Sequence, residues 1–388
     1  YKLNDNNVLK IYSQFYEDDR HFSLINPTDS KSKYQNLNTR NLADLTTFLG
    51  SFTSNIKVGF LSEKYKYFGN ISKDNFTYGH VETLLAKYNL NYKFNADIQT
   101  DFVADFTQNK GNGSDIKEDK RTISGFAIQY KHRINSLLSY DWSIRKEITN
   151  NYKSPILFSV GANFKPTDFY TLKVNVSQNF RIPTFNDLYW QGAGNVDLKP
   201  EKSIQAEIGN VFRVNNFTFS ATFFHSKIND MISWVPQKGG IFMPLNTNRV
   251  SILGGELELN YQKKIYKHFF DFNTNYSYTK SENEKTNKQL IFVPYHKATA
   301  SLAYNYNRLN VFYQYLWNGE VFTQTDNNPK KVIANYMVSN VGFSLDCDAQ
   351  KKYSIGFKIL NLWNENYESV ENRPLPGRNY TLNLTLNF

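Results

Sequence analysis

The side chains that could perform bond chemistry or bind a metal are scattered through this sequence. Its six histidines are far apart and form no His-x-x-x-His pair: His21, His80, His132, His225, His268 and His296. The single cysteine, Cys347, cannot form an intramolecular disulfide and lies between two aspartates in a predicted turn. The sequence contains no Gly-x-Ser-x-Gly nucleophile motif and no glycine-rich phosphate loop. We therefore predict that the protein is not an enzyme and has no cofactor.

One acidic loop offers oxygen ligands of the kind that Ca²⁺ prefers. Asp115, Glu118 and Asp119 lie close together in it, next to a Gly-Asn-Gly loop tip. Their spacing does not match an EF-hand, so a solvated acidic loop is the simpler interpretation. A loop Ca²⁺ site is the alternative.

The sequence contains more candidate ligand-binding residues than candidate catalytic residues, because aromatic and arginine side chains recur in the polar stretches. Such side chains in wet loops can bind flat or amphipathic ligands. We predict substrate contacts at Phe185, Tyr189, Trp190, Trp234, Phe242, Arg249, Phe322, Tyr367 and Arg373. Trp317 and Trp363 fit an aromatic girdle at a membrane interface at least as well.

The elements that must position these residues are strands. In residues 380–388, Tyr and Leu alternate with Thr and Asn before the chain ends on Phe388, so one face suits hydrocarbon and the other suits water. About 18 segments of this kind recur, and long polar loops alternate strictly with tight turns. The stretches 17–39, 64–78 and 227–251 are predicted as long loops.

This organisation predicts an all-β fold, a transmembrane antiparallel β-barrel with its long loops at one end. A soluble sandwich has no reason to separate long from short connections in this way. Apolar residues at helical spacing over a dozen positions are missing, and so is any stretch of about 18 apolar residues.

The charge pattern limits the partners. The net charge is +10, but Lys and Arg are dispersed and often lie beside Asp or Glu. Without a basic helix or an aromatic nucleic-acid motif, binding to nucleic acid is not expected. A basic barrel can instead contact lipopolysaccharide, other outer-membrane lipid or an anionic ligand.

Several short motifs occur in a fixed order from residue 180 onward. They are Phe-Arg-x-Pro at 180–183, Gly-Asn at 194–195, Leu-x-Pro-Glu-x-Ser at 198–203, Glu-x-Gly at 207–209, Asn246 followed by Gly-Gly-Glu at 254–256, Asn-Leu at 361–362 and Pro-Gly-Arg-x-Tyr at 376–380. Together they resemble TonB-dependent outer-membrane receptors, closely over about 170–388. The ending is more similar to cobalamin and siderophore receptors than to glycan importers.

The resemblance implies a 22-stranded barrel preceded by a plug domain. Residues 1–388 would then be the C-terminal portion of the barrel domain, with about 18 of the 22 strands and no plug. It also implies that Arg181 and Glu201 form a charged, plug-facing wall of the lumen, although an ordinary lumen salt bridge is the simpler interpretation. Phe388 resembles the terminal signal that barrel-assembly machinery recognises.

The function implied is TonB-dependent import of a scarce nutrient, such as cobalamin, haem or a ferric siderophore, across the outer membrane of a Gram-negative bacterium. The TonB–ExbB–ExbD complex would supply energy through the plug, and a surface lipoprotein is a further candidate partner. A passive porin is the main alternative. An outer-membrane protease or lipase would need a catalytic cluster that the sequence lacks.

Overall fold

The protein consists almost entirely of β-strands. The computed structural model describes residues 1–22, 31–114, 119–190, 192–237 and 241–387. Contacts divide the chain into two compact units. The first unit contains Tyr1–Asn163, Asn175–Gln205 and Lys227–Arg249, and the second contains Phe164–Val174, Ala206–Ser226 and Val250–Phe388. No helix within the described ranges is long and apolar enough to cross a membrane.

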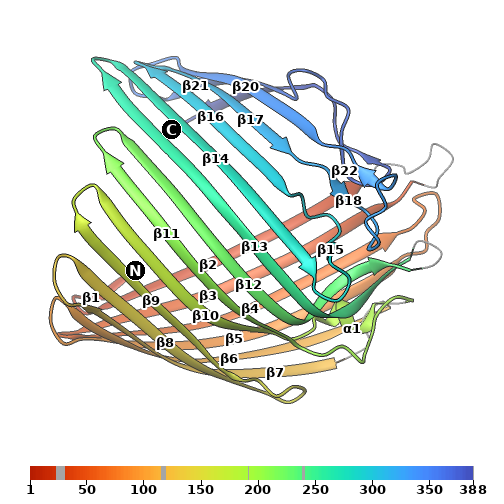
Figure 1. Cartoon of the computed structure of the whole chain (residues 1–388), viewed down its shortest axis with the longest axis horizontal. Helices are drawn as coiled ribbons and strands as arrows, with labels where there is room; N and C mark the ends of the chain where they lie inside the picture. Colours follow the sequence, from red (N-terminus) through yellow and green to blue (C-terminus); the bar gives the residue numbers. More distant parts are fainter. Residues whose placement is uncertain (23–30, 115–118, 191, 238–240, 388) are drawn as a thin grey trace. The chain divides into compact units, whose positions relative to one another are not determined.

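The elements follow one another as labelled in Figure 1. The first part of the chain forms β1 (Lys2–Asn4), β2 (Asn7–His21), β3 (Lys33–Leu49), β4 (Phe52–Phe68), β5 (Thr77–Lys93), β6 (Ile98–Gly113), β7 (Asp119–Arg133) and β8 (Leu138–Thr149). The middle forms β9 (Ile156–Thr167), β10 (Tyr170–Arg181), α1 (Phe185–Tyr189), β11 (Glu201–Val214), β12 (Phe217–Pro236) and β13 (Phe242–Ile265). The last part forms β14 (His268–Asn283), β15 (Lys288–Gln289), β16 (His296–Tyr306), β17 (Leu309–Asn318), β18 (Val321–Phe322), β19 (Val332–Ile333), β20 (Tyr336–Asp346), β21 (Tyr353–Leu360), β22 (Glu368–Val370), β23 (Arg373–Pro374) and β24 (Asn379–Leu386).

The expected strand number is confirmed. Within the described ranges, eighteen strands are eight residues or longer, and the other six are short pieces of two or three residues. In the first unit, β2 to β8 pair antiparallel, each with the next along the chain. Their connections alternate as predicted: 50–51, 94–97 and 134–137 are tight turns at one end, and 22–32, 69–76 and 114–118 connect the other.

The strands of the first unit have one apolar face and one polar face. On β4, Ile56, Val58 and Phe60 are 45%, 48% and 43% exposed although they are large and hydrophobic. The intervening Lys57 points the other way, where its Nζ lies 3.5 Å from a carboxylate oxygen of Asp44. A sheet that shows such side chains to its surroundings and charges to its opposite face matches the alternation of a membrane barrel.

The predicted loop boundaries were wrong in a consistent direction, because the strands are longer than their apolar patterns. Residues 17–39 were expected to be a loop, but β2 and β3 stay paired as far as His21 and Lys33. Likewise β4 and β5 remain paired through Lys66 and Tyr78. Beyond the apolar band both faces are polar, so alternation disappears from the sequence while backbone pairing continues.

The predicted loop 227–251 is also mostly strand. β12 continues to Pro236 and β13 begins at Phe242, so only residues 237–241 separate them. The sequence around this point contains Asp, Ser, Gln and Gly, which favour loops by composition. Long polar strands, however, can project beyond the apolar band with their backbone groups still paired.

The second unit continues the antiparallel pattern. β14 pairs with β13 and β16, and the ladder proceeds through β17, β20, β21 and β24. Short two-stranded pieces, β18–β19 and β22–β23, occur in the connections between β17 and β20 and between β21 and β24. On β24, Tyr380, Leu382 and Leu384 are exposed, which confirms the amphipathic terminal strand. Phe388 lies outside the described residues.

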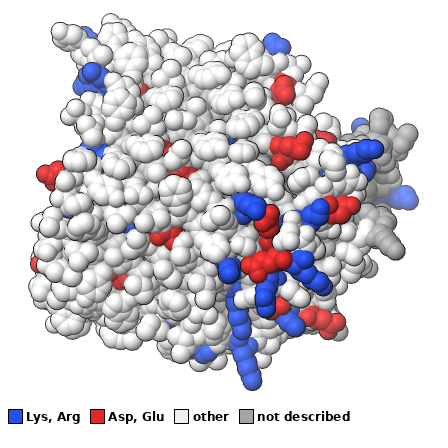
Figure 2. All heavy atoms as spheres, viewed as in Figure 1, with Lys and Arg blue, Asp and Glu red and all other residues white. Residues whose placement is uncertain are grey.

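Charged side chains are concentrated at one side of the face shown in Figure 2. Most of those visible gather toward the right of the view, which is the side where Figure 1 places α1. The rest of that face is largely uncharged.

The two faces predict how the cost of a charged substitution depends on its position along the strand. Val58→Arg places a charge in the middle of the apolar face of β4 and should lower the free energy of unfolding in lipid by about 2–4 kcal/mol. Ser62→Arg lies on the same face beyond the last apolar residue and should cost at most about 1 kcal/mol. Denaturant titration of the folded protein in liposomes measures both, and equal losses would contradict the assignment of this face to lipid.

Candidate functional site

The strongest group of contacts among the predicted site residues centres on Arg181. Arg181 ends β10 and Glu201 begins β11, with residues 182–200 between them. Arg181 Nε and Nη2 donate to the two carboxylate oxygens of Glu201 at 2.7 and 2.9 Å. Two parallel charge-assisted bonds of this kind fix both distance and orientation. They join the two ends of the intervening loop.

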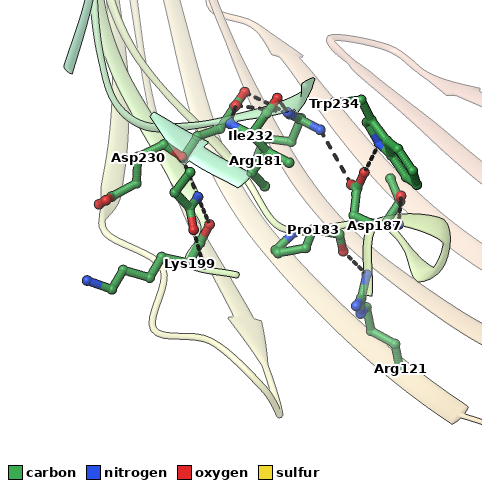
Figure 3. A network of polar contacts seen from close by, with 11 residues as sticks. Arg121, Arg181, Pro183, Asp187, Lys199, Asp230, Ile232 and Trp234 are labelled. Carbon is green, nitrogen blue, oxygen red and sulfur yellow. Dashed lines mark hydrogen bonds and ion pairs between the residues drawn. The ribbon is translucent and has the colours of Figure 1, made fainter. Parts of the chain in front are cut away.

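The same two side chains also hold the backbone of β12. Arg181 Nη2 donates to the carbonyl of Ile232 at 3.1 Å, and the amide of Ile232 donates to Glu201 Oε2 at 2.9 Å (Figure 3). Ile232 is buried, so both of its backbone groups need partners. The ion pair therefore attaches the loop to β12 as well as closing it.

Helix α1 lies inside this loop and is held by Asp187. The helix starts with a capping box, in which the amide of Thr184 donates to Asp187 and the amide of Asp187 donates to the Thr184 hydroxyl. The other carboxylate oxygen of Asp187 accepts the indole N–H of Trp234 on β12 at 2.9 Å. Arg181 Nη1 lies 3.9 Å from Asp187 (Figure 3). We call Arg181, Glu201, Asp187, Trp234 and Ile232 the Arg181 cluster.

A small apolar core supports the cluster. Leu188 from α1, Leu198 from the loop and Ile232 from β12 are all buried together, with Tyr189 packed against them. The helix therefore buries one apolar side while Asp187 bonds on its polar side. The connection between β10 and β11 is therefore packed around buried side chains and is not simply a solvated loop.

Two asparagines fix the rest of the loop. The side-chain oxygen of Asn246 on β13 accepts the backbone N–H of Lys199, and its Nδ2 donates to the backbone carbonyl of Lys199. The same Nδ2 also donates to the carbonyl of Asp230 on β12. Asn195 donates to the carbonyl of Pro244 at 3.1 Å. Asparagine suits these positions because one side chain both donates and accepts. The motif residues Asn195 and Asn246 thus hold the loop against β12 and β13.

Gly194 in the same motif allows close approach. A Cβ at this position would lie 2.6 Å from the backbone nitrogen of Trp190 and 2.7 Å from the carbonyl oxygen of Leu188. Its own amide donates to the carbonyl of Trp190. A larger residue would push the chain away from the end of α1.

Sequence reasoning missed Arg121. This β7 residue is only 5% exposed; it donates from Nη1 to the carbonyl of Pro183 at 2.8 Å and lies over the ring of Phe185. Its Nε and Nη2 are buried without a hydrogen-bond partner. No motif or spacing in the sequence marks this arginine, because it is one polar residue in an ordinary strand pattern.

Six of the predicted ligand residues belong to the first unit. Phe185 and Tyr189 lie in α1, Trp190 follows it, Trp234 lies on β12, and Phe242 and Arg249 lie on β13. Trp234 is engaged by Asp187, as described above. Phe242 and Arg249 are exposed.

The remaining predicted residues belong to the second unit. Phe322 is in β18, Arg373 is in β23, and the ring of Tyr367 packs on Tyr336 with centroids 4.9 Å apart. Trp317 stacks on His296, and Trp363 is 70% exposed.

The predicted acidic loop lies mostly outside the described residues. Asp115 and Glu118 lie outside the described residues, and Asp119 begins β7. Elsewhere in the described ranges, no group of three or more His, Cys, Asp or Glu is arranged to hold a metal ion.

An antiparallel sheet with an apolar face, and with its long connections at one end, defines a membrane-barrel class of protein. The family model described as "TonB dependent receptor-like, beta-barrel" matches residues 1–362. The chain therefore belongs to the TonB-dependent receptor family, as the motifs predicted, and the match is to the β-barrel of that family.

Two curated relatives illustrate the similarity. A vitamin B12 transporter BtuB of Photobacterium profundum is 25% identical over 280 residues, which are 71% of this chain and 45% of the relative. A transferrin-binding protein A of Neisseria meningitidis serogroup B is 32% identical over 28% of this chain and 12% of its own length. The chain therefore spans about half of the length of the vitamin B12 transporter, and a smaller part of the transferrin-binding protein.

Solved structures show the same fold. The ferric enterobactin receptor PfeA of Pseudomonas aeruginosa matches all of this chain and 68% of its own, with a TM-score of 0.80 and 13% identity. The siderophore receptor PirA of Acinetobacter baumannii matches all of this chain and 69% of its own, with a TM-score of 0.77 and 15% identity. The all-β membrane-barrel fold predicted from the sequence is confirmed.

The Arg181 cluster predicts that one substitution will loosen α1. Arg181→Gln removes the paired bonds to Glu201, whose side chain is only 19% exposed, and should lower the local opening free energy by about 2–4 kcal/mol. Chymotrypsin cleavage at Tyr189 and Trp190 should then accelerate at least about tenfold, since roughly 1.4 kcal/mol corresponds to that factor.

A matched control is available at the turn end of the first unit. Arg133 also bonds a carboxylate, that of Asp97 at 2.6 Å, but does not contact the loop 182–200. Arg133→Gln should leave chymotrypsin cleavage near α1 unchanged. Equal cleavage of the Arg181→Gln variant and the unsubstituted protein would show that the cluster does not hold the loop.

Proposed function

We propose that this chain is the barrel portion of an outer-membrane receptor that imports a scarce nutrient with energy from the TonB complex. The observation that carries the proposal is the family match over residues 1–362. The strand organisation supports it, since long connections at one end can form a binding mouth above a membrane wall. The protein acts as a receptor and transporter and catalyses no bond chemistry.

The substrate class follows from the relatives and from the exposed residues. The relatives include a vitamin B12 transporter and receptors for siderophores. Cobalamin, haem and ferric siderophores are large and partly flat, and aromatic and arginine side chains suit such ligands. Phe242 and Arg249, which are exposed on β13, are proposed as ligand contacts together with Phe185, Tyr189 and Trp190. Phe322, Tyr367 and Arg373 are proposed contacts from the second unit.

The polar face of the first unit is proposed to meet a plug domain. Buried polar atoms without partners are rare in folded proteins. Those in the described residues include Asn89 Oδ1, Arg121 Nε and Nη2, and Thr149 Oγ1. All three side chains belong to β5, β7 or β8. A further polar segment of the receptor, or water between the two, would complete these bonds, and Arg181 and Glu201 are proposed to border the same segment.

Uptake by whole cells tests the import function. The full-length receptor should support uptake of cobalamin, haem or a ferric siderophore only when TonB is present and the inner membrane is energised. A passive porin would conduct ions in planar bilayers and would pass solutes without TonB. Uptake that is independent of TonB would refute active import.

Substitution at the proposed mouth tests the ligand contacts. The double variant Phe242→Ala/Arg249→Ala should weaken binding of whichever of the three nutrients the receptor takes by about tenfold or more, because it removes one aromatic and one cationic contact. Titration of the purified full-length receptor measures the dissociation constant.

Phe169→Ala provides the control. Phe169 is an exposed aromatic residue in the tight turn between β9 and β10. Its removal should change neither binding nor uptake. If the Phe242→Ala/Arg249→Ala receptor bound as tightly as the control, these two residues would not be ligand contacts.

A further inference from the structure

Arg121 on β7 is buried but only partly bonded. The residue is 5% exposed, and its Nη1 donates to the carbonyl of Pro183 at 2.8 Å (Figure 3). Its Nε and Nη2 are buried and have no hydrogen-bond partner. An arginine keeps its positive charge when it is buried, and a buried charge without an anion is costly. Water can satisfy the two N–H groups, but it does not supply the missing negative charge.

The two unbonded nitrogens of Arg121 are the pair that binds a carboxylate elsewhere in this protein. In Arg181 the same two atoms, Nε and Nη2, donate to the two carboxylate oxygens of Glu201 at 2.7 and 2.9 Å. The N–H groups of this pair are parallel and match the spacing of the two oxygens of one carboxylate. Arg121 therefore has the donors of a bidentate ion pair and lacks the acid.

The acids that face the same side of the neighbouring strands are already engaged. Arg145 on β8 lies 2.6 Å from Asp105 on β6 and 2.9 Å from Glu147. Among the described residues, no carboxylate forms an ion pair with Arg121. Thr149 on β8, which is diagonal to Arg121 in the strand register, has a buried hydroxyl without a partner. The counter-ion of Arg121 must therefore come from outside the described part of the chain.

The loop 182–200 covers this guanidinium. The guanidinium carbon lies 4.8 Å from the centre of the Phe185 ring, at the start of α1, and Pro183 accepts the one hydrogen bond. Arg121 thus holds the β7 side of the loop through one neutral acceptor and one ring. The Arg181 cluster holds the β12 side through a bidentate ion pair and two further bonds to carboxylates. The attachment to β7 is therefore the weaker of the two.

We propose that Arg121 is a binding site for a free carboxylate of the imported nutrient. Because Nε and Nη2 are buried under the loop, the carboxylate reaches them only when the loop moves off β7. The Arg181 cluster keeps the loop attached to β12 during this movement. Binding of the carboxylate and displacement of α1 are therefore linked, so that each favours the other. The inference rests on the proposed import function and names a chemical group that the nutrient must carry.

This requirement divides the three nutrients considered above. Haem carries propionate carboxylates at the edge of a flat ring, and some ferric siderophores have free carboxylates. Cobalamin has amides and a phosphodiester in their place. A flat ligand with a carboxylate at its edge also suits Phe185 and Tyr189, the proposed aromatic contacts in α1, since a ring can stack on a ring. Haem or a carboxylate siderophore is therefore the expected class.

Citrate is a simple probe of the site, and its trimethyl ester is the matched neutral molecule. At constant ionic strength, saturating citrate should accelerate chymotrypsin cleavage at Tyr189 and Trp190 of the purified full-length receptor about tenfold, because cleavage follows the population of the displaced loop. Trimethyl citrate should have no effect. Cleavage of Arg121→Gln should not depend on citrate. Arg133→Gln should respond as the unsubstituted receptor does, since Arg133 is already paired with Asp97.

Calorimetric titration of the same receptor measures the nutrient directly. Haem should bind about tenfold or more tightly than haem dimethyl ester, because hydrogen bonds between charged groups contribute at least that factor. The two compounds should bind Arg121→Gln equally. Arg121→Lys keeps the charge but lacks the paired donors, so it should recover only part of the difference. If the receptor takes a ferric siderophore, that siderophore and its methyl ester replace the haem pair.

Thermal unfolding in detergent verifies that each variant is folded. Arg121→Met, which has a similar length and no charge, replaces Arg121→Gln if the glutamine variant does not fold. Both variants remove the paired donors, so either one tests the site.

Four outcomes would overturn the proposal. One is a nutrient without a free carboxylate, such as cobalamin. The second is the same citrate response in folded Arg121→Gln as in the unsubstituted receptor. The third is an equal response to inorganic phosphate, which would identify a general anion site. The fourth is no citrate response in the unsubstituted receptor, as expected if an acid of the receptor's own chain fills the site. Uptake without TonB would refute active import but leave these measurements unchanged, so the two proposals fail separately.

Discussion

The pairing of backbone groups is the constraint on which the rest of this structure depends. In hydrocarbon no water can satisfy an N–H or C=O group, so a spanning sheet must pair them all within itself. From β2 to β8 the ladders run without a break from the tight turns to beyond the apolar band. That continuity gives the loop-end residues a rigid base. It also explains why the Arg181 cluster contains backbone groups, since Ile232 obtains its partners from Arg181 and Glu201.

The Arg181 cluster shows how polar residues can replace a core in a protein of this kind. The sheet exposes its apolar side chains on one face, so packing is scarce at the loop end. Among the described residues, the buried hydrophobic cluster consists of Leu188, Leu198 and Ile232. Charge-assisted bonds provide order instead. Asp187 connects the start of α1 to Trp234, and Asn246 binds the chain just before β11. The proposed ligand contacts in the same loop are therefore placed on a fixed support, which would reduce the entropy lost on binding.

The sequence was sufficient for the fold because period-2 alternation and turn spacing are local and repeat many times. The family resemblance drew attention to Arg181 and Glu201, and the salt bridge that was the simpler interpretation is present between them. The sequence-based prediction of loop boundaries failed where alternation stops but strand pairing continues, as at Lys33 and Lys66. A strand with polar residues on both faces has the same composition as a loop. Sequence reasoning also missed Arg121 and α1. The helix is one turn long, and its only signal is the Thr184 and Asp187 capping pair. Arg121 depends on a carbonyl 62 residues away, which no local pattern can reveal.

The net charge does not show which charged side chains are paired inside the protein and which are not. The difference appears only when the partner of each charged side chain is identified. Arg181 and Glu201 use their hydrogen-bonding capacity on each other and on the chain, so their charge does little outside the protein. Lys64 and Lys66 belong to the same unit, but they lie on the face of β4 that is apolar further along the strand, and no ion pair joins them to a described carboxylate. In a count of charged residues, each pair simply adds two. The first pair is used within the fold, whereas the second stays exposed on the surface of the sheet.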